Sequence, residues 1–392
     1  MKIYEIGTGY TPIPAQVAAA TESVVEELTK AYMNMGQQVE IIDISSSCRA
    51  EHNLPITQVK VPSVFTKSDV SLGLVHKLKR VVYSVFLALK LKKILKNLKE
   101  KVIFHFHNQY NLFFFIKLVP QKLRSKAVVV YTNHNGLWCK EWNEVKDVLH
   151  SRYFQEIAAM KSADFVFVLN ENTKKNVVSE LGIDKKKVFV IRNGVNTDTY
   201  KPLDDLNIKS RYNLSDKRVI LQVGSVYENK GQARVAEMLA PLLKNSKNLV
   251  YAYVGGIVSQ EYAETVKNTA EQYDVSDKVV YLGTASPGEE MNALYNIADA
   301  TVFASEYEGF PLVCVESVSA GVPVIFCSDI SINIGDGCIV TTPEKAVDDI
   351  EKNILGNTDE YKKLCVLARE NAVKNFSWQR IADEYIRAVK GE

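Results

Sequence analysis

Two glutamates, Glu308 and Glu316, flank a turn and an apolar run in the stretch SEYEGFPLVCVESVSAGVPVIF, residues 305–326. Gly309 and Pro311 disfavour helix before Pro311, whereas proline is a good first helical residue. We therefore expect Glu308 in a loop and Glu316 about one turn inside the helix that follows. A helix that begins near Pro311 directs free backbone N–H groups outward, so this turn is a candidate phosphate site.

The two carboxylates would repel a phosphate unless they face other groups. Carboxylate oxygens accept hydrogen bonds from the hydroxyls of sugars and ribose. The pattern therefore indicates a phosphate flanked by two polyols, which is the layout of a nucleoside diphosphate sugar. The alternative is that Glu308 is a surface residue and Glu316 an ordinary first-turn glutamate. For Glu316 this alternative is poor, because Val315 and Val318 predict a mostly buried helix in which an unpaired carboxylate is costly.

A lysine and three histidines follow other predicted strands. Lys230 lies in LQVGSVYENKGQ (221–232) and is a candidate point charge for a phosphate, although on this segment alone a solvated lysine at a helix start is the favoured interpretation. His134 comes just after the predicted strand of VYTNHNG. His105 and His107 end another strand, and hydrogen-bonded structural histidines are the favoured interpretation there. These two can in principle share a metal, but the sequence shows no third ligand, so we predict no metal site.

The bulk composition predicts a soluble protein of at least two domains. The chain has 392 residues, of which 46% are hydrophobic and 24% charged, and this length exceeds one ordinary core. A net charge of +2 gives no global electrostatic argument for nucleic acid binding. The six cysteines are scattered without a CxxC pair, which predicts free thiols in a reducing cytosol.

No segment of the sequence predicts export or membrane insertion. Met1 leads directly into the strand-like KIYEIG rather than a signal peptide. No stretch reaches the roughly 18 apolar residues that a membrane-spanning helix needs. We therefore expect a cytoplasmic protein that is soluble or lies on the inner face of the cell membrane.

Short apolar runs alternate with helical patterns such as that of 15–35, which favours a parallel α/β architecture. The predicted strands of the first half are 2–7, 38–44, 101–106, 127–133, 164–170 and 188–193. Those of the second half are 218–225, 249–256, 278–284, 299–305 and 323–328. The polar segment 196–217 between the two series reads as a linker, and 288–298 as a helix. The prediction is two doubly wound domains in tandem, with a cleft between them.

Taken together, these segments resemble the GT-B glycosyltransferases, specifically the retaining glycosyltransferase family 4, over essentially the whole chain. The similar segments are IRNGVNTDTYKP, VGSVYENKG, VYLGTASPGEEMNALYNIADATVFASEYEGFPLVCVESVSAGVPVI with its E-x7-E pair, and NFSWQRIADEYIRAV. The resemblance implies an acceptor-binding Rossmann-like domain over 1–196 and a nucleotide-sugar donor domain over 197–374. A closing helix over 375–392 would pack back on the first domain, and the two domains would face a deep cleft.

The resemblance also implies roles for particular residues. Glu316 would bind the nucleotide ribose, Lys230 would neutralise the diphosphate, and His134 would lie beside the transferred sugar as a catalytic residue. Glu308, also catalytic by orienting the donor, would hold the sugar and diphosphate with the backbone that follows it. The remaining expected donor-binding residues are Gly224, Ser225, Gly309, Phe310, Pro311 and Leu312. The acceptor or phosphate loop would lie within 7–22 and include Gly9, Tyr10 and Thr11.

Two positions depart from the family pattern. Ser225 stands where the family commonly has arginine, so one cation at the diphosphate is missing or comes from elsewhere, with Arg192 and Arg234 as candidates. The paired glycines usual before the first helix are replaced by Val17-Ala18-Ala19-Ala20, although Glu22 matches the glutamate that often follows them.

The expected reaction is the retaining transfer of a sugar from a nucleoside diphosphate sugar, with UDP favoured, to a hydroxyl of a glycan, lipid-linked or other envelope acceptor. Stabilising the leaving diphosphate is its largest electrostatic task, and a helix terminus with basic side chains does this without a metal or other cofactor. Retention without a clearly placed nucleophile suggests front-face substitution. A sugar-nucleotide 2-epimerase, a phosphorylase, or a sugar-nucleotide-binding scaffold with a degraded site are the alternatives. The sequence does not determine the nucleotide base, although UDP is favoured. It also does not determine the sugar, the acceptor or the oligomeric state.

Residues 77–101, KLKRVVYSVFLALKLKKILKNLKEK, combine nine Lys/Arg with one acid and a continuous apolar set. A basic amphipathic helix of this kind can lie on anionic lipid, and NLFFFIKLVPQKLR (111–124) follows nearby. An ordinary surface helix whose lysines face water is the open alternative.

Overall fold

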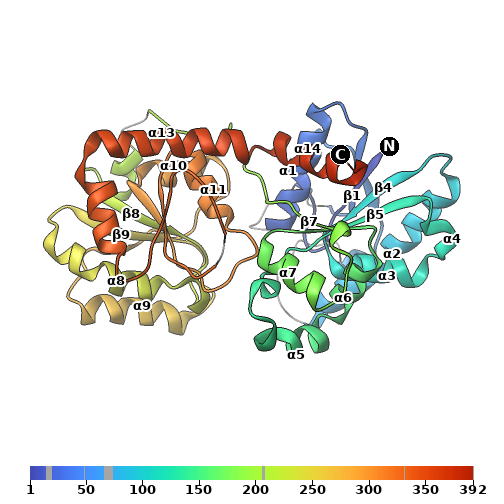
Figure 1. Cartoon of the computed structure of the whole chain (residues 1–392), viewed down its shortest axis with the longest axis horizontal. Coiled ribbons are helices and arrows are strands. Elements are labelled where there is room, and N and C mark those ends of the chain that lie inside the picture. Colours follow the sequence, from blue (N-terminus) through green and yellow to red (C-terminus); the bar gives the residue numbers. More distant parts are fainter. Residues whose placement is uncertain (15–19, 48, 66–73, 205–207, 331, 392) are drawn as a thin grey trace. The chain divides into compact units, whose positions relative to one another are not determined.

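The computed structural model describes residues 1–14, 20–47, 49–65, 74–204, 208–330 and 332–391. These residues form two compact units, one of Met1–Asn193 with Trp378–Glu392 and one of Gly194–Ser377. Each unit contains one parallel sheet with helices on both of its faces (Figure 1). Both are therefore Rossmann-like, as predicted.

The first unit is built on a seven-stranded sheet of order β3-β2-β1-β4-β5-β6-β7, in which every pair is parallel. Its strands are largely buried and rich in Val, Ile and Phe, as expected for a parallel sheet covered on both faces. They are β1 (Ile3–Ile6), β2 (Val39–Ile44), β3 (Ile56–Val59), β4 (Val102–Phe106), β5 (Ala127–Thr132), β6 (Phe165–Val168) and β7 (Val188–Val190).

Two apolar cores cover the two faces of this sheet. On one face α1 and α14 pack against each other and against strand residues such as Ile3 and Val130. On the other face, helices including α2 and α3 bury Tyr83 and Phe115 against Phe104. The helices of this unit are α1 (Ala20–Asn34), α2 (Leu74–Asn97), α3 (Gln109–Leu118), α4 (Gln121–Arg124), α5 (Trp142–Arg152), α6 (Phe154–Ser162), α7 (Glu171–Ser179) and α14 (Trp378–Lys390).

The second unit is built on a six-stranded parallel sheet of order β10-β9-β8-β11-β12-β13. Its strands are β8 (Arg218–Val223), β9 (Leu249–Val254), β10 (Val279–Tyr281), β11 (Ala300–Phe303), β12 (Val324–Phe326) and β13 (Cys338–Val340). Its helices are α8 (Gln232–Asn245), α9 (Gln260–Gln272), α10 (Glu289–Ile297), α11 (Leu312–Ser319), α12 (Ala346–Ile350) and α13 (Thr358–Asn375). The core under α8 and α9 is continuous with β8, β9 and β11, and α11 packs on α13.

Eleven predicted strands are confirmed, and the sequence missed β3 and β13. Both are partly exposed edge strands of four and three residues, too short to show a hydrophobic period. The segment 196–217, predicted as linker, contains one short helical turn at Ile208–Tyr212. Helix α1 begins at Ala20 in the described part of the predicted helix 15–35, and Val17, Ala18 and Ala19 lie outside the described residues.

The strand order reverses at the same place in both sheets. In the first unit the two neighbours at the reversal are β1 and β4, and in the second they are β8 and β11. Open parallel sheets bind their ligands beyond the carboxyl ends of the strands at such switch points. Within the described chain, no helix combines the length and apolar character needed to cross a bilayer.

Candidate functional site

In the second unit, two loops leave the switch point between β8 and β11 and are joined by backbone hydrogen bonds. The loop after β8 contains Asn229, and the loop after β11 contains Glu306 and Tyr307. Glu306 N donates to Asn229 O at 2.9 Å, and Tyr307 N donates to Asn229 Oδ1 at 3.2 Å. Asn229 Nδ2 in turn donates to Tyr307 O at 3.2 Å. One buried asparagine therefore fixes the second loop against the first.

Two ion pairs connect the same loops. Lys230 Nζ pairs with Glu308 Oε1, to which Ser305 Oγ also donates at 3.3 Å. Arg234, in the first turn of α8, pairs with Glu306 and donates from Nη2 to Ala304 O at 2.8 Å. The Lys230 and Glu308 side chains each keep 19% of their surface exposed, so solvent reaches both charges. The structure thus joins Lys230 and Glu308, which are 78 residues apart in sequence.

Two glycines in the first loop allow this close approach. Gly231 has φ of 73°, and a Cβ there would lie 2.9 Å from Ala304 O. Gly224 has φ of 154° and lies against the Lys230 stem, since a Cβ there would lie 3.5 Å from Lys230 Cδ. Ser225, half-buried beside them, accepts a hydrogen bond on its carbonyl from Gln232 Nε2 at 3.0 Å. Gly224 therefore lies beside the Lys230 side chain, and Gln232 fixes the backbone of Ser225.

The turn from Gly309 to Leu312 carries α11. The helix starts at Leu312 and Pro311 is its N-cap, so Pro311 as the first helical residue was wrong by one position. Phe310 is buried and its ring lies 6.1 Å from that of Phe376. The buried Phe310 side chain therefore anchors the turn.

Glu316 lies in the second turn of α11, as predicted. Its Oε2 accepts a hydrogen bond of 2.8 Å from the Tyr295 hydroxyl of α10. Burial raises the pKa of Glu316 to about 7, against the lowering effect of hydrogen bonds from Tyr295 and Tyr200. The carboxylate that the sequence left unpaired thus has a tyrosine partner, although this group still ionises near neutral pH.

In the first unit, the loop after β1 holds Gly9, Tyr10 and Thr11. Gly9 has φ of 81° and lies against the ring of Tyr83, which leaves no room for a Cβ. Lys79 Nζ donates to Tyr10 O at 2.7 Å, and the Arg80 guanidinium lies 4.1 Å from the centre of the Tyr10 ring. Thr11 is buried. Helix α2 therefore holds this loop in place through Lys79, Arg80 and Tyr83.

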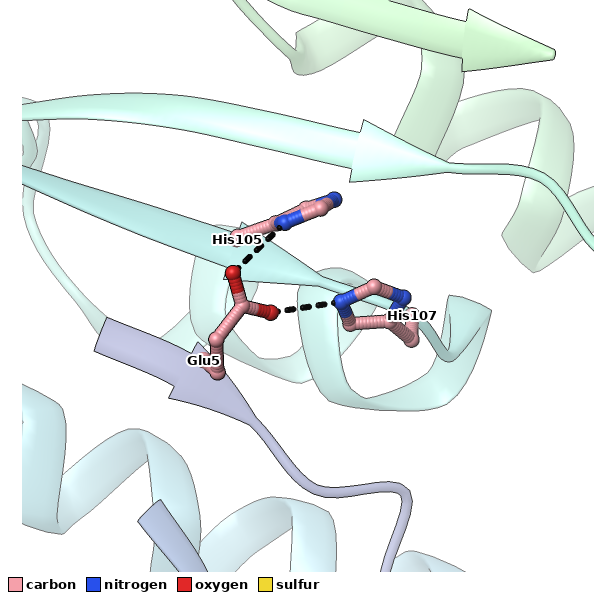
Figure 2. A group of neighbouring side chains, drawn as sticks. All are labelled: Glu5, His105 and His107. Carbon is pink, nitrogen blue, oxygen red and sulfur yellow. Dashed lines mark hydrogen bonds and ion pairs between the residues drawn. The ribbon is translucent and has the colours of Figure 1, made fainter. Parts of the chain in front are cut away.

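A buried cluster joins β1 to β4 at the switch point of the first sheet (Figure 2). Glu5 and His105 are register partners on the two strands, and His107 follows on the same side of the sheet. Figure 2 shows Glu5 pointing between the two imidazoles. His105 Nδ1 lies 2.9 Å from Glu5 Oε1, and His107 Nε2 lies 2.7 Å from Glu5 Oε2. The hydrogen-bonded interpretation of both histidines is confirmed.

The expectation that no third potential metal ligand lies near the two histidines is wrong, because Glu5 joins them. Its atoms and theirs lie within 4.8 Å of one another. Yet the contacts have hydrogen-bond lengths of 2.7 and 2.9 Å, whereas two ligands of one tetrahedral zinc ion lie about 3.4 Å apart. The geometry is therefore that of a carboxylate between two imidazole donors. A lone glutamate within the apolar run KIYEIG was the only sequence signal for it.

The pKa values of the cluster follow from burial and mutual contact. Burial alone would raise the pKa of Glu5, but the two histidines outweigh it and lower the pKa to about 2. Burial and the nearby His105 lower the pKa of His107 to about 4, despite the contact with Glu5. Burial, with His107 and His105 close by, holds the pKa of His134 well below its usual range.

His134 lies two residues after β5 and is half-buried. Its Nε2 lies 3.0 Å from His107 Nδ1, and the two ring planes are inclined by 25° with their centres 5.3 Å apart. The neighbouring loop residues are fixed by Glu156 of α6, a buried carboxylate that the sequence did not single out. Glu156 accepts hydrogen bonds from Tyr131 Oη at 2.9 Å, Asn133 Nδ2 at 2.8 Å, Asn135 Nδ2 at 2.9 Å and Trp138 Nε1 at 2.7 Å.

Two family models match the chain in tandem. Residues 21–199 match the model described as Glycosyltransferase Family 4, and residues 204–334 match Glycosyl transferases group 1. Mannosylfructose-phosphate synthase of Agrobacterium fabrum is 23% identical over 67% of this chain and 63% of its own length. O-antigen chain mannosyltransferase B of Escherichia coli is 22% identical over 69% of this chain and 72% of its own.

The chain spans about three fifths of the length of several curated relatives. For an uncharacterized glycosyltransferase of Methanocaldococcus jannaschii, 26% identical, the share is 59% of the relative and 57% of this chain. Among solved structures, sucrose-phosphate synthase of Thermosynechococcus elongatus matches with a TM-score of 0.73 and 19% identity, covering 100% of this chain and 98% of that one. The Anabaena protein Alr3699/HepE, solved in complex with UDP, matches with a TM-score of 0.73 and 15% identity over 100% of both chains.

Proposed function

Because the chain belongs to the GT-B glycosyltransferases of group 1 and family 4, we propose that it is a retaining, metal-independent sugar transferase. Its donor is a nucleoside diphosphate sugar, and its acceptor is a hydroxyl of a glycan, a lipid-linked saccharide or another envelope component. The observation that carries the proposal is the Lys230–Glu308 pair, which lies beside the start of α11 at the switch point of the second sheet.

In this proposal the second unit holds the donor. Lys230 binds the diphosphate, and the backbone N–H groups of Gly309, Phe310 and Leu312 donate to it at the start of α11, whereas Pro311 has no N–H. Glu308 then exchanges its lysine partner for hydroxyls of the sugar, and Glu316 accepts from the ribose hydroxyls. Charge that develops on the leaving diphosphate therefore meets a fixed cation and oriented N–H groups, which is the largest electrostatic contribution to such a reaction.

Arg234 is the proposed second cation at the diphosphate, in place of the arginine absent at Ser225. It belongs to the second unit and lies on the loop pair that carries Lys230 and Glu308, since it contacts both Glu306 and Ala304. Arg192, the other candidate, belongs to the first unit. Arg234 can leave the half-exposed Glu306 at little cost, because exposed ion pairs contribute about 0–1 kcal/mol.

The first unit supplies His134 and the acceptor side. We propose that His134 contacts the transferred sugar as a neutral imidazole, which agrees with the lowered pKa that burial and the other histidines give it. The acceptor would bind near the loop of Gly9, Tyr10 and Thr11. Front-face substitution, in which the departing phosphate receives the acceptor proton, needs no protein nucleophile and leaves Glu308 to orient the donor.

A UDP-sugar is the favoured donor. The Anabaena neighbour was solved with UDP, and an Escherichia coli relative of 26% identity over 64% of this chain is named as a UDP-Gal galactosyltransferase. A mycobacterial relative named as GDP-mannose-dependent matches over 42% of this chain, so GDP is the second base to test.

Helix α2 is the proposed contact with the inner face of the cell membrane. Its exposed side chains change from apolar to basic along the helix, because Leu78, Phe86 and Leu89 are 55%, 42% and 52% exposed and Lys93 and Lys96 follow on the exposed surface. Such a face can bury its apolar part in the lipid interface while its lysines contact anionic headgroups. Relatives named for phosphatidylinositol mannoside and diphosphoundecaprenol acceptors favour this reading.

Vesicle co-sedimentation tests this contact. We expect binding to anionic vesicles that decreases with salt, and a loss of roughly tenfold or more in Leu89→Glu, because burying a leucine contributes about 1.5–3 kcal/mol. The matched control is Val366→Glu on α13, where Val366 is 56% exposed. Equal binding to neutral and anionic vesicles, or unchanged binding of Leu89→Glu, would remove the membrane proposal.

The two other functions weighed from the sequence predict different products. A 2-epimerase needs a free acid and base in the first unit. Among the buried carboxyl groups there, Glu5 contacts two histidines, Glu156 accepts from four donors, Asp43 pairs with Arg49 through Oδ2, and Glu22 accepts from Thr8. A scaffold that only binds sugar nucleotides would turn over nothing.

Donor hydrolysis without acceptor, assayed across UDP-, GDP- and ADP-sugars, separates these functions and gives the base. We expect one nucleoside diphosphate to be released, the free sugar to keep its anomeric configuration at first, and EDTA to leave the rate unchanged. Release of an epimerised nucleotide sugar, or no product from any donor, would contradict the proposal.

A further inference from the structure

A row of three side chains, Glu5, His107 and His134, runs from the centre of the first sheet to the loop after β5. Glu5 Oε2 lies 2.7 Å from His107 Nε2, and His107 Nδ1 lies 3.0 Å from His134 Nε2. Glu5 and His107 are fully buried, whereas His134 is half-buried. Figure 2 shows the buried end of this chain, where both imidazoles face one carboxylate. Apolar packing alone does not require these three polar side chains to be hydrogen-bonded in sequence.

Counting protons along this chain fixes the state of each imidazole. An ionised carboxylate only accepts hydrogen bonds, so His107 Nε2 must carry the proton that points at Glu5. A neutral His107 then has an unprotonated Nδ1, which only accepts. The 3.0 Å contact therefore requires His134 to donate from Nε2. In neutral His134 the other nitrogen, Nδ1, keeps its lone pair, and no described residue donates to it.

The surroundings keep the cluster in these charge states. The two histidines outweigh the effect of burial on Glu5 and lower its pKa to about 2, so the carboxylate stays ionised. Burial lowers the pKa of His107 to about 4, so its ring stays neutral at physiological pH. Thr132 Oγ1 lies 2.7 Å from His105 Nε2 and 3.3 Å from the Tyr385 hydroxyl, so the second imidazole on Glu5 is also held at both nitrogens.

The backbone around His134 is held independently of the imidazole chain. Glu156 accepts from the side chains of Asn133 and Asn135, the residues on either side of His134. The loop can therefore keep its position when the imidazole chain is broken. This separation allows a substitution at His107 to change the protonation of His134 without moving it.

We infer that Glu5 and His107 are positioning residues, which hold His134 in the tautomer with its proton on Nε2 and a free lone pair on Nδ1. The consequence for catalysis rests on the proposed function. A sugar hydroxyl beside His134 then donates its proton to a fixed acceptor, whereas in the opposite tautomer the hydroxyl oxygen would have to accept from an N–H. The three side chains thus fix the direction of the hydrogen bond between His134 and the hydroxyl, and wrong tautomers are costly in catalytic histidines.

Two substitutions at His107 separate this inference from a packing role. In His107→Gln, the amide N–H can donate to Glu5 while its carbonyl oxygen accepts from His134, because amide N and O have nearly the spacing of the two imidazole nitrogens. His107→Met has a similar length and can do neither. Both are labelled with 15N-histidine, and the His134 tautomer is determined by NMR from one-bond and two-bond couplings, with the exposed His150 as an internal reference.

We expect His134 to be the Nε2–H tautomer in the wild type and in His107→Gln, and a mixture of tautomers in His107→Met. Sugar transfer should fall roughly 10- to 100-fold in His107→Met, the range found when a partner that orients an imidazole is removed, and clearly less in His107→Gln. An Nδ1–H or mixed His134 in the wild type would overturn the inference whether or not the variants fold. Identical behaviour of the two variants would also overturn it.

The NMR result does not depend on the reaction. A fixed tautomer in a protein that turns over no donor would retain the positioning inference and reject the proposed function, whereas sugar transfer with an averaged tautomer would do the opposite. Addition of ZnCl2 should leave the resonances of His105, His107 and His134 in place. A shift of these resonances would show a metal site in the cluster and contradict the hydrogen-bonded chain.

Discussion

The two sheets carry charged groups at the same topological position, but these groups are partly exposed to solvent in the second unit and buried in the first. Between β8 and β11, Lys230 and Glu308 form a pair on loops, with part of each side chain open to solvent. Between β1 and β4, Glu5 and His107 form a pair on and just after the strands, fully buried. An open pair can exchange its partner for a ligand, whereas a buried pair leaves an uncompensated charge when it breaks. The difference suggests that the charged pair of the second unit binds a ligand, whereas the buried pair of the first unit orients His134.

Lys230→Ala is expected to give the largest effect on donor turnover, a fall of about 10²–10³, because one removed electrostatic donor typically costs this much. The free energy of unfolding should change by less than about 1 kcal/mol, since the pair is partly solvated. Steady-state hydrolysis of the accepted donor and urea unfolding measure the two quantities. The control is Lys267→Ala, an exposed lysine of α9 paired with Glu264. If Lys230→Ala lost stability but kept normal turnover, the Lys230–Glu308 pair would be structural and would not bind the donor.

Glu316→Gln should raise the donor KM by roughly 10- to 100-fold, because a hydrogen bond to a charged group contributes about 1.5–3 kcal/mol. The pH dependence is a second readout. Burial raises the pKa of Glu316 to about 7, so the ionised acceptor is lost as pH falls through 7 and donor affinity should weaken from pH 8 to pH 6. This slope should be absent in Glu316→Gln. A variant with the wild-type KM and slope would remove Glu316 from the donor site.

Glu156→Gln tests the buried side of the comparison through stability. The carboxylate accepts from Tyr131, Asn133, Asn135 and Trp138, and glutamine replaces one of its two accepting oxygens with an NH2 group that faces two of these donors. We expect a loss of about 2–4 kcal/mol in the free energy of unfolding, measured in urea at fixed pH. A loss below about 0.5 kcal/mol, which is the level of ordinary surface substitutions, would mean that the loop before Trp138 is held by other contacts.

Glu22→Gln gives the smallest expected effect, a change in how stability depends on pH. Burial raises the pKa of Glu22 to about 7, against the hydrogen bond from Thr8, while the unfolded group titrates near 4.5. The folded state therefore binds more protons between these values, and its stability falls as pH rises through 7. Urea unfolding at pH 5.5 and pH 8 should show a smaller fall in the variant than in the wild type. Equal falls would place the Glu22 pKa near its ordinary value.

The sequence predicted the parts of the molecule in which a local pattern carries the information. The apolar runs predicted eleven of the thirteen strands that the described residues form, and the spacing of Glu308 and Glu316 around Gly309-Phe310-Pro311 predicted a loop glutamate and a helical one. These are properties of neighbouring residues. Edge strands β3 and β13 are too short and too exposed for such a pattern.

The sequence did not predict the contacts made across strands. Glu5 and His105 are 100 residues apart, and only the parallel register of β1 and β4 places them opposite each other. The partners of Glu316 and of the loop around His134 are of the same kind, because Tyr295 and Glu156 come from neighbouring helices. In the sequence, a buried charge is visible only as a polar residue within an apolar run. The sequence does not show which residue pairs with it.

Calorimetric titration of UDP and GDP tests most directly whether the switch point of the second unit holds a nucleoside diphosphate. We predict that the wild type binds one of them with one site per chain, that Lys230→Ala weakens this binding at least tenfold, and that Lys267→Ala binds as the wild type does. No binding of either nucleotide by the wild type, or equal binding by wild type and Lys230→Ala, would contradict the account.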